Sequence, residues 1–174
     1  MQDKQGRKTE ITVVAGQYAG AKPPSPPPKS WASRPDTDVA IWTLRLDSGA
    51  EWMLPAAKIG SNRMLYFFKG KSLSVAGKNF APGLGIRLRA DAEAGLVNGT
   101  EASELLLLQG RPIGEPVAQY GPFVMNSALE IRQAFSDYQQ TEFGGWPWKS
   151  DDPVHPKTEG RFARHADGKM ERAG

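Results

Sequence analysis

The order of its segments constrains the fold of this chain most: a long series of short strand-like segments precedes the first helix-like one. Residues 11–15 are rich in β-branched side chains, and residues 39–46 alternate, with Trp42, Leu44 and Leu46 on one face. The 19 glycines and 14 prolines supply turns between such segments. Because there is neither βαβ alternation nor an internal repeat, the sequence predicts an all-β domain of packed sheets or a closed barrel.

The other strand-like segments before residue 110 lead to two specific expectations. They are residues 51–54, 63–69, 72–75, 84–88 and 103–108. The Gly70-Lys71 pair predicts a hairpin between segments 63–69 and 72–75. The four consecutive leucines at 105–108 predict a strand that is buried on both faces.

A single helix is predicted after these strands. Ser127 stands three residues before Glu130, which is the spacing of a capping box that satisfies free backbone N–H groups at a helix start. The residues that follow form an apolar stripe at helical spacing, namely Ile131, Ala134, Phe135 and Tyr138. We expect Gly144-Gly145 to end the helix. The stripe either packs on the protein's own sheet or forms a face for a partner.

The bulk properties exclude several classes of protein. The sequence of 174 residues has no cysteine, so disulfides, thiolate metal sites and cysteine nucleophiles are impossible. The start of the chain is polar, unlike a signal peptide, and no apolar run approaches the roughly 20 residues of a membrane span. A net charge of +3, with basic residues scattered among acidic ones, does not favour nucleic-acid binding. We therefore expect a cytoplasmic protein that interacts with neither membranes nor nucleic acids.

The second half of the chain carries a family resemblance. The segment EPVAQYGPFVMNS, a helix ending in DYQ, then FGGWPW and DPVHP followed by GRFAR, resembles the C-terminal half of bacterial pirin-like proteins. Pirins are two-domain members of the cupin superfamily. The resemblance implies an all-β, cupin-type jelly-roll β-barrel or sandwich with one C-terminal α-helix. The expected organisation is a linker or cut end at residues 1–10, a pirin C-terminal cupin-like domain at 11–148 and an extended polar tail at 149–174.

The resemblance also implies where iron belongs. In pirins the non-haem iron site, tied to quercetin dioxygenase activity in some members, belongs to the N-terminal barrel, which this sequence does not include. A metal-binding cupin barrel shows G-x5-H-x-H. Counted from Gly49, its two histidine positions hold Pro55 and Ala57. The first histidine of the chain is His155, so we expect no metal ligands, no catalytic residues and no cofactor in this barrel. Iron is expected only in the N-terminal domain of a full-length pirin.

Smaller chemical signals have two interpretations each. Arg87 and Arg89 share a strand face, which is either an anion site or a solvated surface. His155 lies near Asp151 and Asp152, and is either part of a carboxylate–histidine cluster or a proline-flanked surface residue. No nucleophile elbow or phosphate-binding loop is present in the sequence.

Two functions follow as alternatives. The first is a non-catalytic structural or interaction half of a pirin-like protein, which associates as a homodimer or with a separate pirin N-terminal cupin domain. The candidate interface residues are aromatic: Tyr120, Phe123, Phe135, Tyr138, Trp146 and Trp148. The second is part of a metal-dependent oxidoreductase of the quercetin dioxygenase type, whose metal site lies in a separate N-terminal cupin domain.

Overall fold

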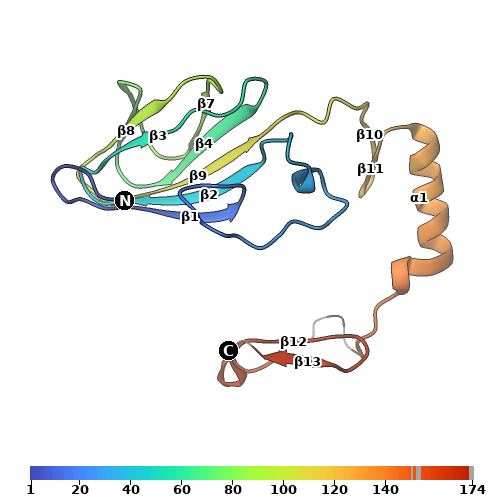
Figure 1. Ribbon diagram of the computed structural model, residues 1–174. Helices are drawn as coiled ribbons and strands as arrows, with labels where there is room; N and C mark the ends of the chain where they lie inside the picture. The colour runs from blue at the N-terminus through green and yellow to red at the C-terminus, as the bar shows by residue number, and fades with distance from the viewer. Residues whose placement is uncertain (150, 152–153, 173–174) are drawn as a thin grey trace. The chain divides into compact units, whose positions relative to one another are not determined.

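The chain divides into two units, which are described separately below. The computed structural model describes residues 1–149, 151 and 154–172. The first unit comprises residues 1–114 and the second residues 115–174. In Figure 1 the first unit runs from blue to yellow and the second from orange to red.

A five-stranded antiparallel sheet forms one layer of the first unit. Its order is β1 (Thr9–Ala15), β2 (Ala40–Leu46), β9 (Ser103–Gly110), β4 (Asn62–Lys69) and β7 (Leu84–Leu88). As expected, Trp42, Leu44 and Leu46 share one face and are buried. A short 3-10 turn, η1 (Trp31–Ser33), lies in the long connection between β1 and β2.

A four-stranded sheet forms the second layer (Figure 1). Its order is β3 (Glu51–Leu54), β8 (Ala94–Asn98), β5 (Leu73–Val75) and β6 (Lys78–Phe80). Both sheets contribute to one core, in which Leu54, Leu65, Leu105 and Leu107 are fully buried. The predicted all-β cupin-type fold is confirmed, in the form of a sandwich of two sheets.

The predicted hairpin between residues 63–69 and 72–75 is wrong. β4 pairs with β9 and β7 in one sheet, whereas β5 pairs with β6 and β8 in the other. A register shift interrupts β4 between Phe67 and Lys69. Gly70 follows with φ +135°, and a Cβ there would collide with the side chain of Ser103. The chain therefore leaves the first sheet at Gly70 and crosses to the second instead of turning back.

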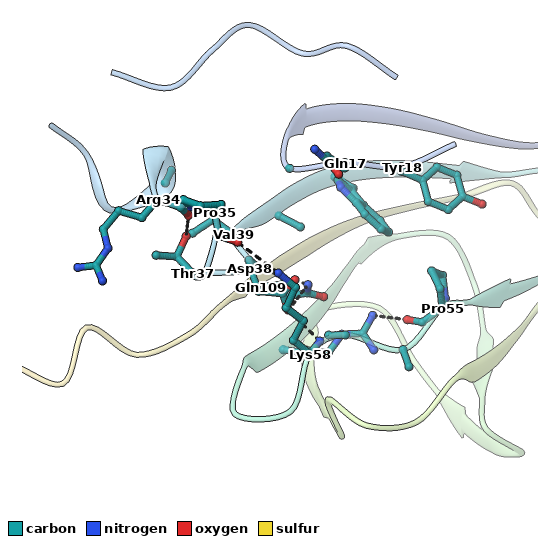
Figure 2. Close-up of a pocket in the computed structure, with 17 residues that line it drawn as sticks. Gln17, Tyr18, Arg34, Pro35, Thr37, Asp38, Val39, Pro55, Lys58 and Gln109 are labelled. Atoms are coloured by element: carbon teal, nitrogen blue, oxygen red, sulfur yellow. Dashed lines mark hydrogen bonds between the residues drawn. The ribbon is translucent and has the colours of Figure 1, made fainter. Parts of the chain in front are cut away.

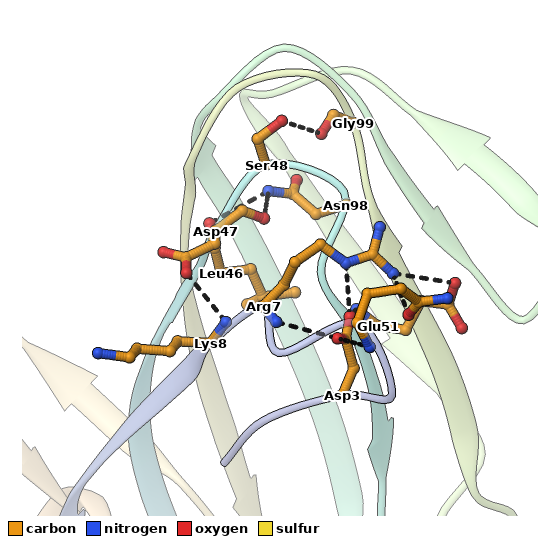
Figure 3. A network of polar contacts seen from close by, with 10 residues as sticks. Asp3, Arg7, Lys8, Leu46, Asp47, Ser48, Glu51, Asn98 and Gly99 are labelled. Atoms are coloured by element: carbon orange, nitrogen blue, oxygen red, sulfur yellow. Dashed lines mark hydrogen bonds and ion pairs between the residues drawn. The ribbon is translucent and has the colours of Figure 1, made fainter.

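The first eight residues are folded, although the sequence led us to expect a linker there. Gln2 forms a β-bridge with Lys8, and β1 begins at Thr9. The Asp3 carboxylate accepts hydrogen bonds from the Arg7 side chain (Nε–Oδ2 2.7 Å) and from the backbone N–H groups of Gln5, Arg7 and Glu51. Figure 3 shows this network beside the turn that follows β2. It ties the start of the chain to the beginning of β3.

The second unit contains a small hairpin and the predicted helix. β10 (Ala118–Tyr120) pairs with β11 (Phe123–Met125), and α1 spans Ala128–Thr141. Ser127 is confirmed as the N-cap, because the Glu130 N–H donates to Ser127 Oγ (3.3 Å). The Glu130 carboxylate accepts from Ser127 Oγ (2.8 Å) rather than from the backbone N–H that a full capping box would use. The helix ends before Gly144, because Glu142 adopts the left-handed conformation and a 3-10 turn, η2 (Glu142–Gly144), follows.

The described part of residues 149–174 is more ordered than the extended tail that we expected. It includes a 3-10 turn, η3 (Lys157–Glu159), and a hairpin of β12 (Phe162–Arg164) and β13 (Met170–Arg172). Among the described residues, the helices are too short and too polar to cross a membrane.

Candidate functional site

Five aromatic side chains of the second unit form one continuous cluster, which we call the aromatic cluster. The Phe123 ring meets the edges of Phe135, Tyr138 and Phe143 at centroid distances of 4.8, 6.3 and 5.9 Å. Tyr120 contacts Phe135 at 5.7 Å, and Tyr138 contacts Phe143 at 5.3 Å. These are tilted edge-to-face contacts, the arrangement that the charge distribution of aromatic rings favours.

The hairpin and the helix bring these rings together. Tyr120 and Phe123 are paired across the β10–β11 turn, and the helical stripe carries Phe135 and Tyr138. Phe143 reaches the cluster because Glu142 and Phe143 both have positive φ, 49° and 52°, which folds the chain back after the helix. Such consecutive strained residues persist when packing holds them, and the ring contacts of Phe143 supply that packing.

The aromatic cluster remains open on its outside. Tyr120 is 70% exposed, Phe143 61% and Tyr138 49%, while Phe123 and Phe135 are half-buried. Four of the six predicted interface residues therefore lie together in this cluster. Trp148 instead lines a small hollow of about 280 Å³ with His155 and Phe162, and Trp146 is 56% exposed. Phe143 was missed, because the sequence predicted that the helix would run on to Gly144.

A second apolar surface, the outer patch, lies on the outside of the five-stranded sheet. It consists of paired residues on the three central strands of that sheet: Ile41 on β2, Leu106 and Leu108 on β9, and Met64 and Tyr66 on β4. Leu108 is 37% and Tyr66 40% exposed. A charged row borders the outer patch, in which Lys69 pairs with Glu104 at 2.6 Å.

The outer patch corrects the expectation for the leucine run. Leu105 and Leu107 are fully buried in the core, but Leu106 is half-buried and Leu108 is exposed. β9 is therefore the central strand of the sheet with only one face buried. Its sequence resembles that of a strand covered on both sides, which indicates that the outer face suits a further apolar layer.

A cleft of about 680 Å³ opens at one end of the sandwich (Figure 2). It lies where β1 and β3 end and where β2 and β4 begin, because antiparallel neighbours bring those ends to the same edge. Pro55 and Ala57, which occupy the two histidine positions of the cupin motif, both line it. Counted from Gly49, the two histidine positions of the motif therefore fall at this cleft.

Asp38 organises the polar wall of the cleft. Its Oδ2 accepts hydrogen bonds from the Lys58 N–H at 3.0 Å, from Ser61 Oγ at 2.7 Å and from Gln109 Nε2 at 3.0 Å. Asp38 itself adopts a positive φ of 53°. Figure 2 shows Asp38 close to Lys58 and Gln109. The carboxylate joins the loop before β2 to the loop before β4 and to β9.

Arg63 is the unexpected residue of the cleft. It lies on β4 in phase with the buried Leu65 and Phe67 and is only 2% exposed. Its Nη2 donates to the Pro55 carbonyl at 2.8 Å. Burial lowers the pKa of the Arg63 guanidinium, and the nearby charge of Asp38 acts in the opposite direction. The sequence contained a signal for this residue, because Arg63 stands at an inward-facing position of an alternating strand, but it was not predicted as a site residue.

The donor atoms of the cleft do not fit iron. Among the described residues that line it, Asp38 is the carboxylate and none is a histidine. Cupin iron sites use imidazole together with carboxylate, so Pro55, Ala57 and one already bonded carboxylate leave the ion without its ligands.

The smaller chemical signals also have structural outcomes. Arg89 donates two hydrogen bonds to Asp91, at 3.0 and 2.8 Å, so its guanidinium is engaged within the surface loop. The exposed His155 contacts Phe162 with the ring centroids 4.3 Å apart and the ring planes tilted by 53°. Asp152 of the alternative carboxylate–histidine cluster lies outside the described residues. Among those that are described, no group of three histidine or carboxylate side chains is placed to hold a metal.

Comparisons with known proteins place the fold in a family. A family model for the pirin C-terminal cupin domain matches residues 41–144. A Pseudomonas aeruginosa protein named "Putative quercetin 2,3-dioxygenase" is 35% identical over 133 residues, which cover 75% of this chain and 45% of that protein. Pirin-1 of Arabidopsis thaliana is 30% identical over 150 residues, covering 78% of this chain and 46% of its own length.

A solved structure gives the same result. A crystal structure of quercetin 2,3-dioxygenase from Acinetobacter baumannii superposes with a TM-score of 0.63 and 26% identity, over 83% of this chain and 46% of that one. The chain thus spans about half the length of the curated relatives it matches. Because the family model covers more than half of the sequence, the chain belongs to the pirin family, to which it contributes the C-terminal cupin domain.

Proposed function

We propose that this chain is a non-catalytic interaction domain, the C-terminal cupin half of a pirin-like assembly, and that it associates with a second cupin barrel. The observation that carries the proposal is the aromatic cluster. Among the described residues of the second unit, only Ile131 and Ala134 are buried, although five aromatic rings are gathered there. A hairpin and one helix with so small a core need a further surface to pack against.

The exposed rings offer enough apolar area for such packing. Tyr120, Tyr138 and Phe143 are each about half exposed or more. Covering the exposed part of one ring contributes roughly 1–2 kcal/mol, so a shared surface of this kind stabilises an association measurably. The outer patch supplies a second apolar area on the five-stranded sheet, and the leucine sequence of β9 suits coverage there as well.

A second copy of this chain is the occupant that we propose for these surfaces. Pirins contain two cupin barrels, and this chain contains one and spans about half the length of its relatives. A second copy presents a barrel of matching fold whenever the chain itself is present. Symmetric self-association through identical patches is the commonest solution for such proteins. A separate pirin N-terminal cupin domain is the other candidate partner.

The barrel's own residues support a role without catalysis. The cleft holds Pro55 and Ala57 at the expected metal-ligand positions, and no histidine precedes His155 in the sequence. The proposed role is therefore structural, and iron chemistry enters only where a separate pirin N-terminal cupin domain is the partner. The absence of cysteine fits a reducing, cytoplasmic setting.

Sedimentation velocity over a wide concentration range tests the proposal. We expect the wild type to sediment as a dimer, and the double variant Tyr120→Ser/Phe143→Ser to sediment as a monomer with unchanged circular dichroism. The matched control is Ile59→Ser, since Ile59 is 81% exposed on a loop of the first unit. A wild type that stays monomeric at high concentration would contradict the proposal, as would a double variant that remains dimeric.

One observation favours a second function. The superposition on a quercetin 2,3-dioxygenase structure suggests a chain that completes a dioxygenase whose iron is held by a separate N-terminal cupin domain. On this alternative the chain alone binds no iron, and activity appears only after that domain is added. Metal analysis of the purified chain after incubation with ferrous iron, followed by oxygen-consumption assays with and without the domain, distinguishes the two functions.

A further inference from the structure

We propose that the cleft of the first unit binds a small organic monocarboxylate with a flat apolar body, and that Arg63 is the residue that holds the carboxylate. The inference goes beyond the proposed interaction role. It rests on the bonding of Arg63, on the charge balance of the cleft and on its aromatic wall.

The guanidinium of Arg63 has donors that the protein does not use. Among the residues that the structure describes, only Nη2 finds an acceptor, the Pro55 carbonyl, while Nε and Nη1 are buried without a partner. Burying unpaired N–H groups of a charged side chain is costly, so such groups are normally matched by an acceptor. Nε and Nη1 point away from different edges of the same planar group, so one oxygen atom of an anionic acceptor can meet one of them.

The nearest carboxylate does not supply that acceptor. Asp38 Oδ2 already accepts three hydrogen bonds, and no ion pair within 4.0 Å joins Asp38 to Arg63 among the described residues. Arg34 and Lys58 also line the cleft, so its cationic side chains outnumber the single lining carboxylate. Of the other two cations, Arg34 pairs with Asp36, and Lys58 is exposed, so water solvates its charge. Among the described residues that line the cleft, Arg63 is the cation that is buried without an ion pair.

The charge of the ligand follows from this balance. Asp38 lies close enough to influence Arg63 electrostatically, and its negative charge disfavours a dianion such as a phosphate monoester. A monocarboxylate matches one buried guanidinium in charge, and one of its oxygen atoms can accept from an N–H group that lacks a partner.

The body of the ligand follows from the cleft wall. Tyr18 and Trp42 line it with their ring centroids 5.0 Å apart, and Pro55 and Ala57 add small apolar surfaces. The buried Nε1 of Trp42 likewise has no hydrogen-bond partner within the described part of the chain. A volume of about 680 Å³ lies within the range of ordinary small-molecule sites. A planar aromatic or unsaturated acid matches this mixture of ring faces and donors.

Benzoate is the probe for the test, with neutral benzamide as its matched analogue. We expect benzoate to raise the melting temperature of the full chain in a dose-dependent manner and to shift the tryptophan fluorescence, and benzamide to bind at least tenfold more weakly. Arg63→Met is expected to weaken benzoate binding at least tenfold. The control Arg87→Met, on an exposed residue of β7 outside the cleft, is expected to bind as the wild type does.

A second variant guards against misfolding of Arg63→Met. Ala57→Phe fills the half-buried wall of the cleft from a loop and is expected to abolish benzoate binding while leaving the circular dichroism unchanged. The proposal is overturned if the wild type does not bind benzoate, if benzamide binds equally well, or if Arg63→Met and Ala57→Phe both retain wild-type binding. The cleft is lined by residues of the first unit of one chain, so loss of benzoate binding can be distinguished from loss of dimerisation.

Discussion

Leu106 on β9 is paired directly with Tyr66 on β4, and both side chains lie on the outer face of the five-stranded sheet. The residues that flank them in sequence, Leu105, Leu107, Leu65 and Phe67, are buried in the core on the opposite face. The same two strands therefore supply the centre of the core and the centre of the outer patch. An apolar outer face on a central strand is a surface that a further layer of protein stabilises.

Replacing Leu108 with lysine tests the outer patch as a contact surface. Leu108 is 37% exposed, so Leu108→Lys is expected to change the free energy of unfolding of the monomer by less than about 1 kcal/mol. A charge placed within an apolar interface is expected to weaken dimerisation at least tenfold, measured by analytical ultracentrifugation. Val97→Lys on β8, where Val97 is 44% exposed in the other sheet, is the control. Equal dissociation of both variants would argue against the outer patch.

Asn98 is predicted to be the polar residue on which the first unit depends most. Its buried side-chain amide donates to the carbonyls of Leu46, Asp47 and Glu101, and its oxygen accepts from Ser103 Oγ at 2.6 Å. Asn98→Ala leaves these buried groups unpaired and is expected to lower the free energy of unfolding by roughly 3 kcal/mol.

Chemical denaturation measures the effect of Asn98→Ala. Asn79→Ala, an exposed asparagine of β6, is the control and is expected to stay within about 0.5 kcal/mol of the wild type. A loss of stability no larger than that of the control would show that the Asn98 hydrogen bonds are dispensable.

The Asp3 network predicts a pH dependence of stability. Burial alone raises the pKa of Asp3, but hydrogen bonds from the Arg7 side chain and from the backbone of Glu51, Arg7 and Gln5 outweigh it and lower the pKa to about 2. The folded pKa is thus below the unfolded value of about 3.9. The contribution of Asp3 is present above the unfolded pKa and is lost as the pH falls from about 4 towards 2.

Asp3→Asn is expected to lower the melting temperature at pH 7 and to approach the wild type as the pH falls towards 2. Melting curves measured at a series of pH values test this. Glu10→Gln, at an exposed position of β1, is the control and is expected to follow the wild type throughout. A difference between Asp3→Asn and the wild type that is constant with pH would show that the charge of Asp3 is not what stabilises the fold.

The local part of the fold could be predicted from the sequence. Alternation placed Trp42, Leu44 and Leu46 on one face, and the spacing of Ser127 and Glu130 located the helix start. Both signals depend on residues close together in the chain, where backbone geometry fixes which side chains meet.

Pairing between distant strands could not be predicted in this way. The turn at Gly70-Lys71 looked like a hairpin, yet the partners of β4 are β9 and β7, because the strained backbone at Gly70 sends the chain to the other sheet. The run of four leucines indicated that both faces of β9 are apolar. It could not indicate that the second sheet covers only one of these faces.

The candidate sites were predicted to different extents. Four of the six predicted interface residues lie together in the aromatic cluster, because they come from two short segments, and their role as an interface stays a prediction. The Arg63 cleft was not predicted. Its lining comes from five separate segments of the chain, and the alternation within β4 does not indicate which segments meet around Arg63.

The position of β9 at the centre of its sheet has a consequence for how the chain acquires its structure. In the described sheet, the β1–β2 pair and the β4–β7 pair share no hydrogen bonds with one another. They are joined by β9, the last strand of the first unit along the chain, which pairs with β2 and with β4. During synthesis, both strand pairs keep an unpaired edge until residues 103–110 have been made. The contacts of β9 with β2 join residues far apart in the sequence, and such contacts form slowly. A chain interrupted before Ser103 would therefore expose the unpaired edges of two strand pairs, and we expect it to aggregate.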